Sequence, residues 1–414
     1  MKKTTITIPF ICGDGIGPEI MSAARRVIDE AVRKASKSEK QIVWKECLAG
    51  KKAMEEYGEA LPADTLQAIK DYKIVLKGPL TTPVGGGYRS LNVRLRQELD
   101  LYACIRKTRW FEGLPSPHCA PRGIDITLFR ENTEDIYIGI EYQPGSKDHK
   151  RWMDTFKRSH PEDYIRLPSP EQCGIGIKPI SKSGSQRLVR AAIVWALTNH
   201  KHRLTLVHKG NIMKYTEGAF CNWGYDLAKS DFAEKVFTKR QFEAVYKEKG
   251  KEAADSLKAE KQISGVLWMD DLIADVAFEQ LITYPQQFEV IATTNLNGDY
   301  LSDAAAALTG GVGISPGANI NFETGIGVFE ANHGSADNIA GRNLANPSSL
   351  ILSGEMMLRF MGWLDEADML HHAVEETIRL KRVTRDLARQ IDNAEPLGTQ
   401  EFAEEIISQM VERT

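Results

Sequence analysis

Arginine residues stand at the ends of three apolar or helical segments, at Arg96, Arg106 and Arg130. An isolated arginine is usually a solvated surface charge, but its planar guanidinium also binds a carboxylate through two parallel hydrogen bonds. Three such groups at element ends indicate a site for a small molecule with several carboxylates. Ser90 and Asn92 begin the helical pattern that holds Arg96, so they can offer donors to one more carboxylate. A plain helix cap is an equally good interpretation of Ser90.

Two aspartates four residues apart, Asp299 and Asp303, follow the strongly apolar segment VIATT. If both lie in a helix, they share one face, where their like charges repel unless a cation binds between them. A hard divalent ion with oxygen ligands, Mg²⁺ or Mn²⁺, fits such a pair. Asp271 and Asp275 have the same spacing, and for them helix capping or a solvated face is the simpler interpretation.

Candidates for proton transfer follow two further strand-like segments. Tyr137 comes after LFREN, and Lys209 comes after LTLVH. Oxidation of an alcohol needs a base, and protonation of an enol needs an acid; a tyrosine and a lysine with a lowered pKa can do both. Each residue taken alone is more often structural.

These residues need strands and helices to position them. Segments around Ile6–Phe10, KIVLKGPL, DITLFREN, LTLVHKGN and FEVIATT are predicted strands, and they alternate with helical patterns such as the one from Met21 to Ala31. Such alternation predicts an α/β fold, in which ligands bind beyond the carboxyl ends of strands. The GDGIG of residues 13–17 does not have the G-x-G-x-x-G spacing, so we interpret it as a structural turn.

Two regions depart from this alternation. Residues 135–181 are rich in Pro, Gly, Tyr and Ile, and we expect a β-rich excursion from the domain. Residues 233–261 are dense in Lys and Glu and are predicted to form solvated helices.

Composition excludes several classes of function. A formal net charge of −3 over 414 residues gives no reason to expect nucleic acid as a partner. The six cysteines form no C-x-x-C pair, which disfavours a zinc site and favours a reducing compartment. The polar N-terminus predicts no signal peptide, and no apolar run approaches the roughly 18 residues of a membrane span. We therefore expect a cytoplasmic protein with no membrane association.

Long strings of this chain resemble the isocitrate/isopropylmalate dehydrogenase family, and their pattern is most similar to the bacterial NADP-type isocitrate dehydrogenases. The strings are GDGIGPEI, LKGPLTTPVGGGYRSLNVRLRQELDLYACIR, LFRENTEDIYIGIE, HKGNIMKYTEGAF, NLNGDYLSDAAAALTGGVG, EANHGS and NPSSLILSGEMMLR, in collinear order over residues 13–359. The resemblance implies oxidative decarboxylation of isocitrate to 2-oxoglutarate and CO₂ with reduction of NAD(P).

The resemblance also implies a non-Rossmann α/β fold. Its large domain would hold residues 1–101 and 310–414, its small domain residues 102–134 and 182–309, and residues 135–181 would clasp two subunits. Lys209 and Asp275 would act in the neighbouring subunit's site, so an obligate homodimer with shared active sites is expected.

Residue roles follow from the same resemblance. Tyr137 and Lys209 match the catalytic pair. The implied metal ligands are Asp275, Asp299 and Asp303, so the resemblance overrides the simpler interpretation of Asp275. The implied isocitrate-binding residues are Ser90, Asn92, Arg96, Arg106 and Arg130.

The implied cofactor site is built from loops. It comprises Thr81, His333, Gly334, Ser335, Ala336, Asp337, Asn338, Ile339, Asn346, Arg385 and Arg389. NADP-type members carry Lys-Tyr, and NAD-type members Asp-Ile, where this chain has Asn338-Ile339. Arg385 and Arg389 lie four residues apart and can clamp a 2′-phosphate, whereas Asp337 would oppose it. The two arginines favour NADP over NAD.

Two alternatives to isocitrate oxidation stay open. One is another 2-hydroxy diacid, isopropylmalate or homoisocitrate. The polar Ser90 and Asn92 favour a third carboxylate over the apolar side chain of isopropylmalate. The other is a non-catalytic binding protein, which is disfavoured because every matched catalytic position holds a competent residue.

Overall fold

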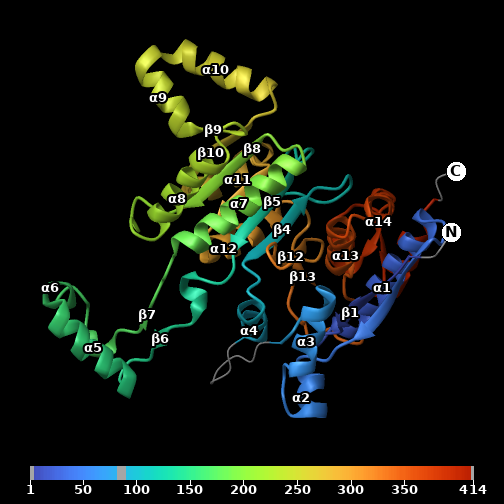
Figure 1. The fold of residues 1–414 in the computed structure, drawn as a ribbon. Coiled ribbons are helices and arrows are strands. Elements are labelled where there is room, and N and C mark those ends of the chain that lie inside the picture. Colours follow the sequence, from blue (N-terminus) through green and yellow to red (C-terminus); the bar gives the residue numbers. More distant parts are fainter. Residues whose placement is uncertain (1–3, 82–89, 412–414) are drawn as a thin grey trace.

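The structure is a computed structural model that describes residues 4–81 and 90–411. Its centre is a sheet of 11 strands with helices packed against it (Figure 1). Across the sheet, the strands are β2 (Lys40–Glu46), β1 (Thr4–Ile11), β3 (Ile74–Lys77), β13 (Ile326–Ala331), β12 (Pro316–Asn321), β4 (Ala103–Arg109), β5 (Asp125–Glu131), β11 (Val290–Thr293), β8 (Arg203–His208), β10 (Leu267–Ile273) and β9 (Val236–Thr238). The predicted strands are confirmed.

The strands change direction in the middle of the sheet. β12 runs antiparallel to β13 and to β4, and β4 runs antiparallel to β5. On one side of this centre β2, β1, β3 and β13 are parallel. On the other side β5, β11, β8, β10 and β9 are parallel, so their carboxyl ends meet at one edge. Arg130, Lys209, Asp275 and Asp299 all lie at or just beyond those ends.

Helices form where the apolar pattern has a period of 3.6 residues. The helix predicted from Met21 to Ala31 is α1 (Gly17–Ala35), and both of these residues are buried in it. Further helices that pack around the sheet are α2 (Lys51–Tyr57), α3 (Ala63–Tyr72), α4 (Leu91–Glu98), α7 (Lys182–Thr198), α8 (Glu217–Asp231), α11 (Ala274–Thr283), α12 (Asn295–Ala307), α13 (Ser348–Phe360), α14 (Leu364–Arg379), α15 (Arg385–Ala388) and α16 (Thr399–Ser408). A small parallel pair, β14 (Arg382–Thr384) and β15 (Glu395–Leu397), lies near the C-terminus.

The α/β prediction is confirmed, and the mixed, continuous sheet is not a Rossmann sheet. The predicted large domain holds residues 1–101 and 310–414, and the predicted small domain holds residues 102–134 and 182–309. The boundary between them falls between β12 and β4 in the strand order. That division into two domains stays a prediction. None of the described helices is both long and apolar enough to cross a bilayer.

The expectation of a β-rich segment at residues 135–181 is wrong. Its strands are only β6 (Glu141–Tyr142) and β7 (Ile175–Gly176), and its largest element is the helix α5 (Lys147–Ser159). Ser146 caps this helix by accepting from the N–H of His149, and the rings of Trp152 and Phe156 stack 4.9 Å apart along it. Short helical turns complete the segment: η1 (Asp135–Ile138), α6 (Pro161–Tyr164) and η2 (Pro170–Gln172).

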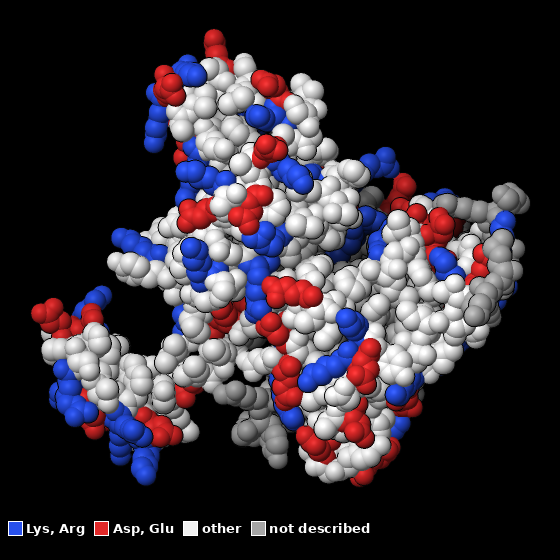
Figure 2. All heavy atoms as spheres, in the orientation of Figure 1, with Lys and Arg blue, Asp and Glu red and all other residues white. Residues whose placement is uncertain are grey.

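The solvated helices predicted in residues 233–261 are confirmed. α9 (Lys239–Lys249) buries no residue, and α10 (Lys251–Ile263) buries only Ala254. The side chains of Thr238 and Gln241 form a capping box at the start of α9. Figure 2 shows positive and negative side chains interspersed over the face it presents, in agreement with the small net charge.

Candidate functional site

Arg130 lies at the end of β5 with only 2 % of its side chain exposed. Its Nε donates to Asn295 Oδ1 at 2.8 Å, and its Nη1 donates to Asp299 Oδ1. Gly298 permits this approach, because a Cβ there would lie 2.6 Å from Arg130 Cγ. The first turn of α12 is therefore held against the end of β5.

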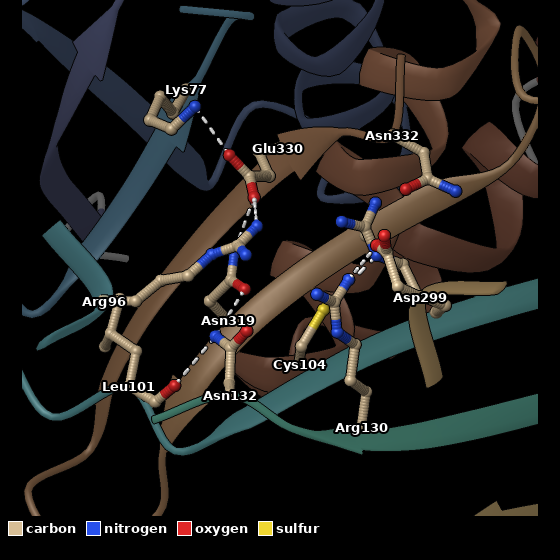
Figure 3. Close-up of polar contacts among 12 residues, drawn as sticks. Lys77, Arg96, Leu101, Cys104, Arg130, Asn132, Asp299, Asn319, Glu330 and Asn332 are labelled. Carbon is tan, nitrogen blue, oxygen red and sulfur yellow. Dashed lines mark hydrogen bonds and ion pairs between the residues drawn. The ribbon is translucent and has the colours of Figure 1, made fainter. Parts of the chain in front are cut away.

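Glu330 on β13 gathers a second set of polar groups (Figure 3). Its carboxylate receives Arg96 Nη2 at 3.1 Å, Lys77 Nζ at 2.5 Å and Asn319 Nδ2 at 2.6 Å. Burial opposes the ionisation of Glu330, yet Lys77, Arg96 and Arg106 hold the pKa of its carboxyl far below the usual range. Glu330 therefore stays ionised and fixes Arg96.

Arg96 and Arg106 retain donors for a ligand. Arg96 Nε and Arg106 Nη1 are buried and have no hydrogen-bond partner among the described residues. Gly317 leaves room for Arg106, since a Cβ there would lie 2.8 Å from Nη1. A buried donor without a partner is costly, so an anion that reaches both groups would be bound favourably.

Ser90 and Asn92 lie at the start of α4, as predicted. Ser90 occupies the N-cap position, but its side chain makes no capping hydrogen bond to the helix. Asn92 Oδ1 is buried without a hydrogen-bond partner in the described part of the chain. The plain-cap interpretation of Ser90 therefore lacks the bond on which it would rest.

Asp299 and Asp303 both lie within α12, so the predicted shared helix face is present. Asp299 Oδ2 also accepts a hydrogen bond of 2.6 Å from the Tyr137 hydroxyl. Burial and the charge of Asp299 raise the pKa of Asp303. For Asp299 burial is outweighed by the opposing effects of Arg130 and Tyr137, which lower its pKa. This mutual repulsion is what a divalent cation would relieve.

Lys209 and Asp275 form a separate pair. Lys209 Nζ lies 2.5 Å from Asp275 Oδ1, and the lysine lowers the pKa of that carboxyl. Asp275 is at the start of α11, whereas Asp271 is still in β10, so these two aspartates do not share a helix face. Within residues 4–81 and 90–411, no hydrogen bond or ion pair joins Lys209 or Asp275 to Tyr137, Asp299 or Asp303.

The expected cofactor residues include two loops that lie against each other. Thr81 Oγ1 donates to Ser335 Oγ at 3.1 Å. Asp14, in the glycine turn, accepts from the Thr81 N–H at 2.8 Å, and the Ile16 N–H donates to the Ser335 carbonyl at 2.9 Å. His333 Nε2 is buried without a partner in the described chain, and burial lowers the pKa of this imidazole. The turn at residues 13–17 is thus a structural support for the loop.

The two arginines of the predicted 2′-phosphate clamp lie at the two ends of the short helix α15. Arg385 begins the helix and Arg389 caps its end, with the Arg389 N–H donating to the Arg385 carbonyl at 3.3 Å. Neither guanidinium has an ion pair within the described residues. Asn346 connects the region to the same helix by donating to Asp386 Oδ2 at 3.0 Å.

Asp337 does not stand as an isolated negative charge. Its Oδ2 lies 2.9 Å from Lys51 Nζ, which lowers the pKa of the carboxyl. Asn338 is exposed, and Ile339 packs partly against the core, so the loop presents Asn338 outward. Gly334 and Ala336 complete the loop, with Ala336 at a φ of +41°.

Sequence reasoning missed four supporting residues: Asp14, Lys51, Lys77 and Glu330. The string GDGIG contains Asp14, and only its turn character was visible. A lone lysine gives no signal, so Lys51 and Lys77 could not be found. Glu330 could have been noticed as a carboxylate within an apolar strand, IGVFEA, where a buried charge requires a partner.

Comparisons with known proteins extend over almost the whole chain. The family model described as isocitrate/isopropylmalate dehydrogenase matches residues 7–406. The isocitrate dehydrogenase [NADP] of Staphylococcus epidermidis is 54 % identical over 97 % of this chain and 94 % of its own. That of Helicobacter pylori is 48 % identical over 97 % and 93 %. The isocitrate dehydrogenase structure from Methylococcus capsulatus is 36 % identical, with a TM-score of 0.76 over 98 % of this chain and 99 % of its own.

Proposed function

The chain belongs to the isocitrate/isopropylmalate dehydrogenase family, and on that basis we propose that it oxidises and decarboxylates isocitrate to 2-oxoglutarate with reduction of NADP. The observation that carries the choice of substrate is the set of guanidinium groups around one site. Arg130 is held at the end of β5, and Arg96 and Arg106 keep buried donors without partners in the described chain. Guanidinium groups of this kind can bind the carboxylates of a tricarboxylate through paired hydrogen bonds.

The first turn of α4 favours isocitrate over isopropylmalate. Ser90 and Asn92 offer polar atoms where isopropylmalate would need an apolar wall. An apolar group at this position is disfavoured because the buried Asn92 Oδ1 would stay without a hydrogen-bond partner.

We assign the metal site to Asp299 and Asp303, with Asp275 supplied by a second subunit. The raised pKa of Asp303 beside Asp299 is the sign that this carboxylate pair fits a cation. When bound, Mg²⁺ or Mn²⁺ supplies positive charge that stabilises negative charge developing on the substrate's oxygen.

Tyr137 is the proposed acid of the reaction. Burial and its hydrogen bond to Asp299 raise the pKa of the phenol to about 12, although Arg130 lies over the ring and opposes the shift. The hydroxyl is therefore protonated at neutral pH, the form that can give a proton to an enol. Lys209 is assigned the second proton-transfer role because it lies directly beyond β8, where its Nζ pairs with Asp275 Oδ1.

A homodimer with shared sites accounts for the position of Lys209. Among the described residues, the side chains of Lys209 and Asp275 make no hydrogen bond or ion pair with the Tyr137 side chain, which supports a site that these groups complete from a second copy. In the turn after Lys209, Ile212 is 70 % exposed to solvent and Tyr215 is 92 % exposed. Apolar side chains exposed to this extent favour burial against another subunit. Residues 135–181, which extend from the body in Figure 1, are the proposed clasp.

NADP is favoured by the charges around the cofactor loops. Arg385 and Arg389 offer two guanidinium groups to a phosphate, and Lys51 offsets the negative charge of Asp337. We assign these further residues to the proposed cofactor site: His333, Gly334, Ser335, Ala336, Asn338 and Ile339 of one loop, with Thr81, which donates to Ser335, and Asn346, which donates to Asp386. The buried Nε2 of His333 fits a hydrogen bond from the cofactor.

A panel of substrates tests the proposal. Purified protein with Mg²⁺ and NADP is given isocitrate, isopropylmalate or homoisocitrate, and reduced cofactor is followed by absorbance. We expect the largest kcat/KM with isocitrate. A larger kcat/KM with either other acid would reassign the site, and no turnover with any of the three would leave a binding protein as the better hypothesis.

A further inference from the structure

Two fully buried carboxylates share one lysine outside the set of residues assigned above. Lys178 Nζ lies 2.5 Å from Asp135 Oδ1 and 2.9 Å from Glu217 Oε1, and both acidic side chains have no exposed surface. Two buried carboxylates with one ammonium leave an excess negative charge, which is costly unless further donors satisfy it. The remaining donors show what this triad of Asp135, Lys178 and Glu217 holds.

Asp135 connects the turn that carries Tyr137 to α12. Its Oδ2 accepts from the Leu296 N–H at 3.0 Å, and its Oδ1 accepts from the Ile136 N–H at 2.7 Å. Asp135 has a φ of +68°, a conformation that few residues other than glycine adopt without support. Two residues later in the same η1 turn, Tyr137 reaches Asp299. The Asp135 carboxylate thus fixes the backbone from which Tyr137 projects.

Glu217 connects the turn that carries Lys209 to the same end of α12. Its Oε2 accepts from the Lys209 N–H at 2.9 Å and from Asn297 Nδ2 at 2.7 Å. Its Oε1 accepts from the Thr294 hydroxyl at 2.8 Å. The backbone at Lys209 is therefore anchored to a carboxylate with no exposed surface.

Lys178 pairs with both Asp135 and Glu217, and it lies near the C-terminal end of residues 135–181. The base of that segment is closed by the Asp135 N–H, which donates to the Pro179 carbonyl at 2.9 Å, and by Ser181, whose N–H donates to Glu134 Oε2 at 2.7 Å. A change in how this segment is held would reach both carboxylates through one ammonium.

We propose that Asp135, Lys178 and Glu217 form a positioning unit that sets Tyr137 and Lys209 relative to each other. This inference rests on the proposed function, in which Tyr137 serves its own chain's site and Lys209 serves the neighbouring one. Because the triad joins both groups within one chain, it mechanically links the two active sites of the dimer through the base of the clasp. The triad residues contact no substrate; they act through the backbone of the two catalytic residues.

Point variants with a matched control separate this role from general stability. Lys178→Met removes the shared ammonium, Lys178→Arg restores a cation, and Glu217→Gln keeps the shape of the side chain. Glu366→Gln is the control, since Glu366 is a buried carboxylate paired with Lys40 at 2.7 Å away from the assigned residues. Each variant is measured for kcat, KM for isocitrate, dimer content and Tm.

We expect Lys178→Met and Glu217→Gln to lower kcat about tenfold or more, with KM for isocitrate within about threefold of wild type. Lys178→Arg should recover most of the loss, and Glu366→Gln should lower Tm without this selective loss of kcat. Unchanged kcat in folded, dimeric Lys178→Met and Glu217→Gln would overturn the proposal, as would an equal loss of kcat in the control.

A readout without turnover separates this proposal from the proposed function. Lysines are reductively methylated with ¹³C, and the dimethyl resonance of Lys209 is assigned with a Lys209→Arg variant. Glu217→Gln should shift that resonance and Glu366→Gln should not. Inactive wild type with the expected shift would count against isocitrate oxidation only, whereas an unmoved resonance would count against the triad.

Hybrid dimers test the link between sites. A dimer of one Tyr137→Phe chain and one Lys209→Met chain holds a single intact site, with its tyrosine and its lysine from different chains. Lys178→Met is then placed on one chain or the other. The proposal predicts a lower kcat for both placements. Loss with only one placement would mean that the triad serves only one catalytic group, which contradicts a shared positioning unit.

Discussion

The hydroxyl of Tyr137 donates a 2.6 Å hydrogen bond to Asp299 Oδ2, so the proposed proton donor and a proposed metal ligand are in direct contact. Arg130 completes the group by donating to the other oxygen of Asp299. A change in the charge of Asp299 therefore changes the pKa of the Tyr137 phenol. In the proposed reaction, this contact would keep the acid next to the metal ligand that faces the developing substrate charge.

Removal of the two proton-transfer groups should affect rate more than binding. We expect Tyr137→Phe and Lys209→Met to lower kcat by about 10²–10⁴, because proton transfer contributes in the transition state. The measurement is steady-state kcat together with the Kd of isocitrate from calorimetry. Near-normal kcat in both variants would remove the acid and base assignments.

Chelation of divalent metal should abolish turnover and readdition of Mg²⁺ should restore it. Asp299 and Asp303 repel each other without a cation, so Asp303→Asn should raise the Mg²⁺ concentration needed for half-maximal rate. The control is Asp392→Asn, a substitution outside the assigned metal ligands, which should leave the Mg²⁺ requirement unchanged. Full activity in protein verified to be free of metal would contradict the site.

The preference for NADP should depend on α15 and on Lys51. Arg389→Ser removes one fork, and Lys51→Met leaves the Asp337 charge without its partner, so both should shift the ratio of kcat/KM values toward NAD. Arg379→Ser, which changes an arginine paired with Glu376 on α14, is the control. A ratio unchanged in Arg389→Ser, or a wild type that prefers NAD, would show that these arginines do not bind the phosphate.

Stability toward acid should depend on Glu330. Burial opposes its ionisation, but Lys77, Arg96 and Arg106 lower its pKa below the ordinary 4.5. A carboxyl with a lowered folded-state pKa stabilises the fold above its unfolded-state pKa, and this contribution is lost as the pH falls below that value. Urea unfolding at several pH values should show Glu330→Gln less stable by about 3 kcal/mol at neutral pH, as for other broken buried pairs. Its stability should also fall less steeply in acid; an acid slope equal to that of wild type would contradict this assignment.

The sequence predicted the positions of those candidate site residues that depend on local secondary structure alone. Asp299 and Asp303 were expected on one helix face because the alanine-rich pattern after VIATT has a helical period, and α12 contains both. Arg130 was expected at a strand end because DITLFREN changes from apolar to polar residues, and β5 ends there. Local periodicity is sufficient for such assignments.

Contacts between distant segments could not be predicted in this way. Lys77 meets Glu330 because β3 and β13 are neighbours with these two residues in register, a pairing that no local pattern reveals. The helix α5 was missed because the Pro- and Gly-containing residues around it concealed its period within residues 135–181. The buried triad was missed for the first reason, since its three members come from separate elements.

The most direct test of the central claim is a product balance. Purified protein with isocitrate, Mg²⁺ and NADP is sampled over time, and reduced cofactor, 2-oxoglutarate and CO₂ are each quantified. Oxidative decarboxylation predicts that the three products form in equal amounts, and that none forms when isocitrate is omitted. Reduced cofactor without matching CO₂ would indicate oxidation alone, and the absence of all three products with fully metal-loaded protein would contradict isocitrate dehydrogenase activity.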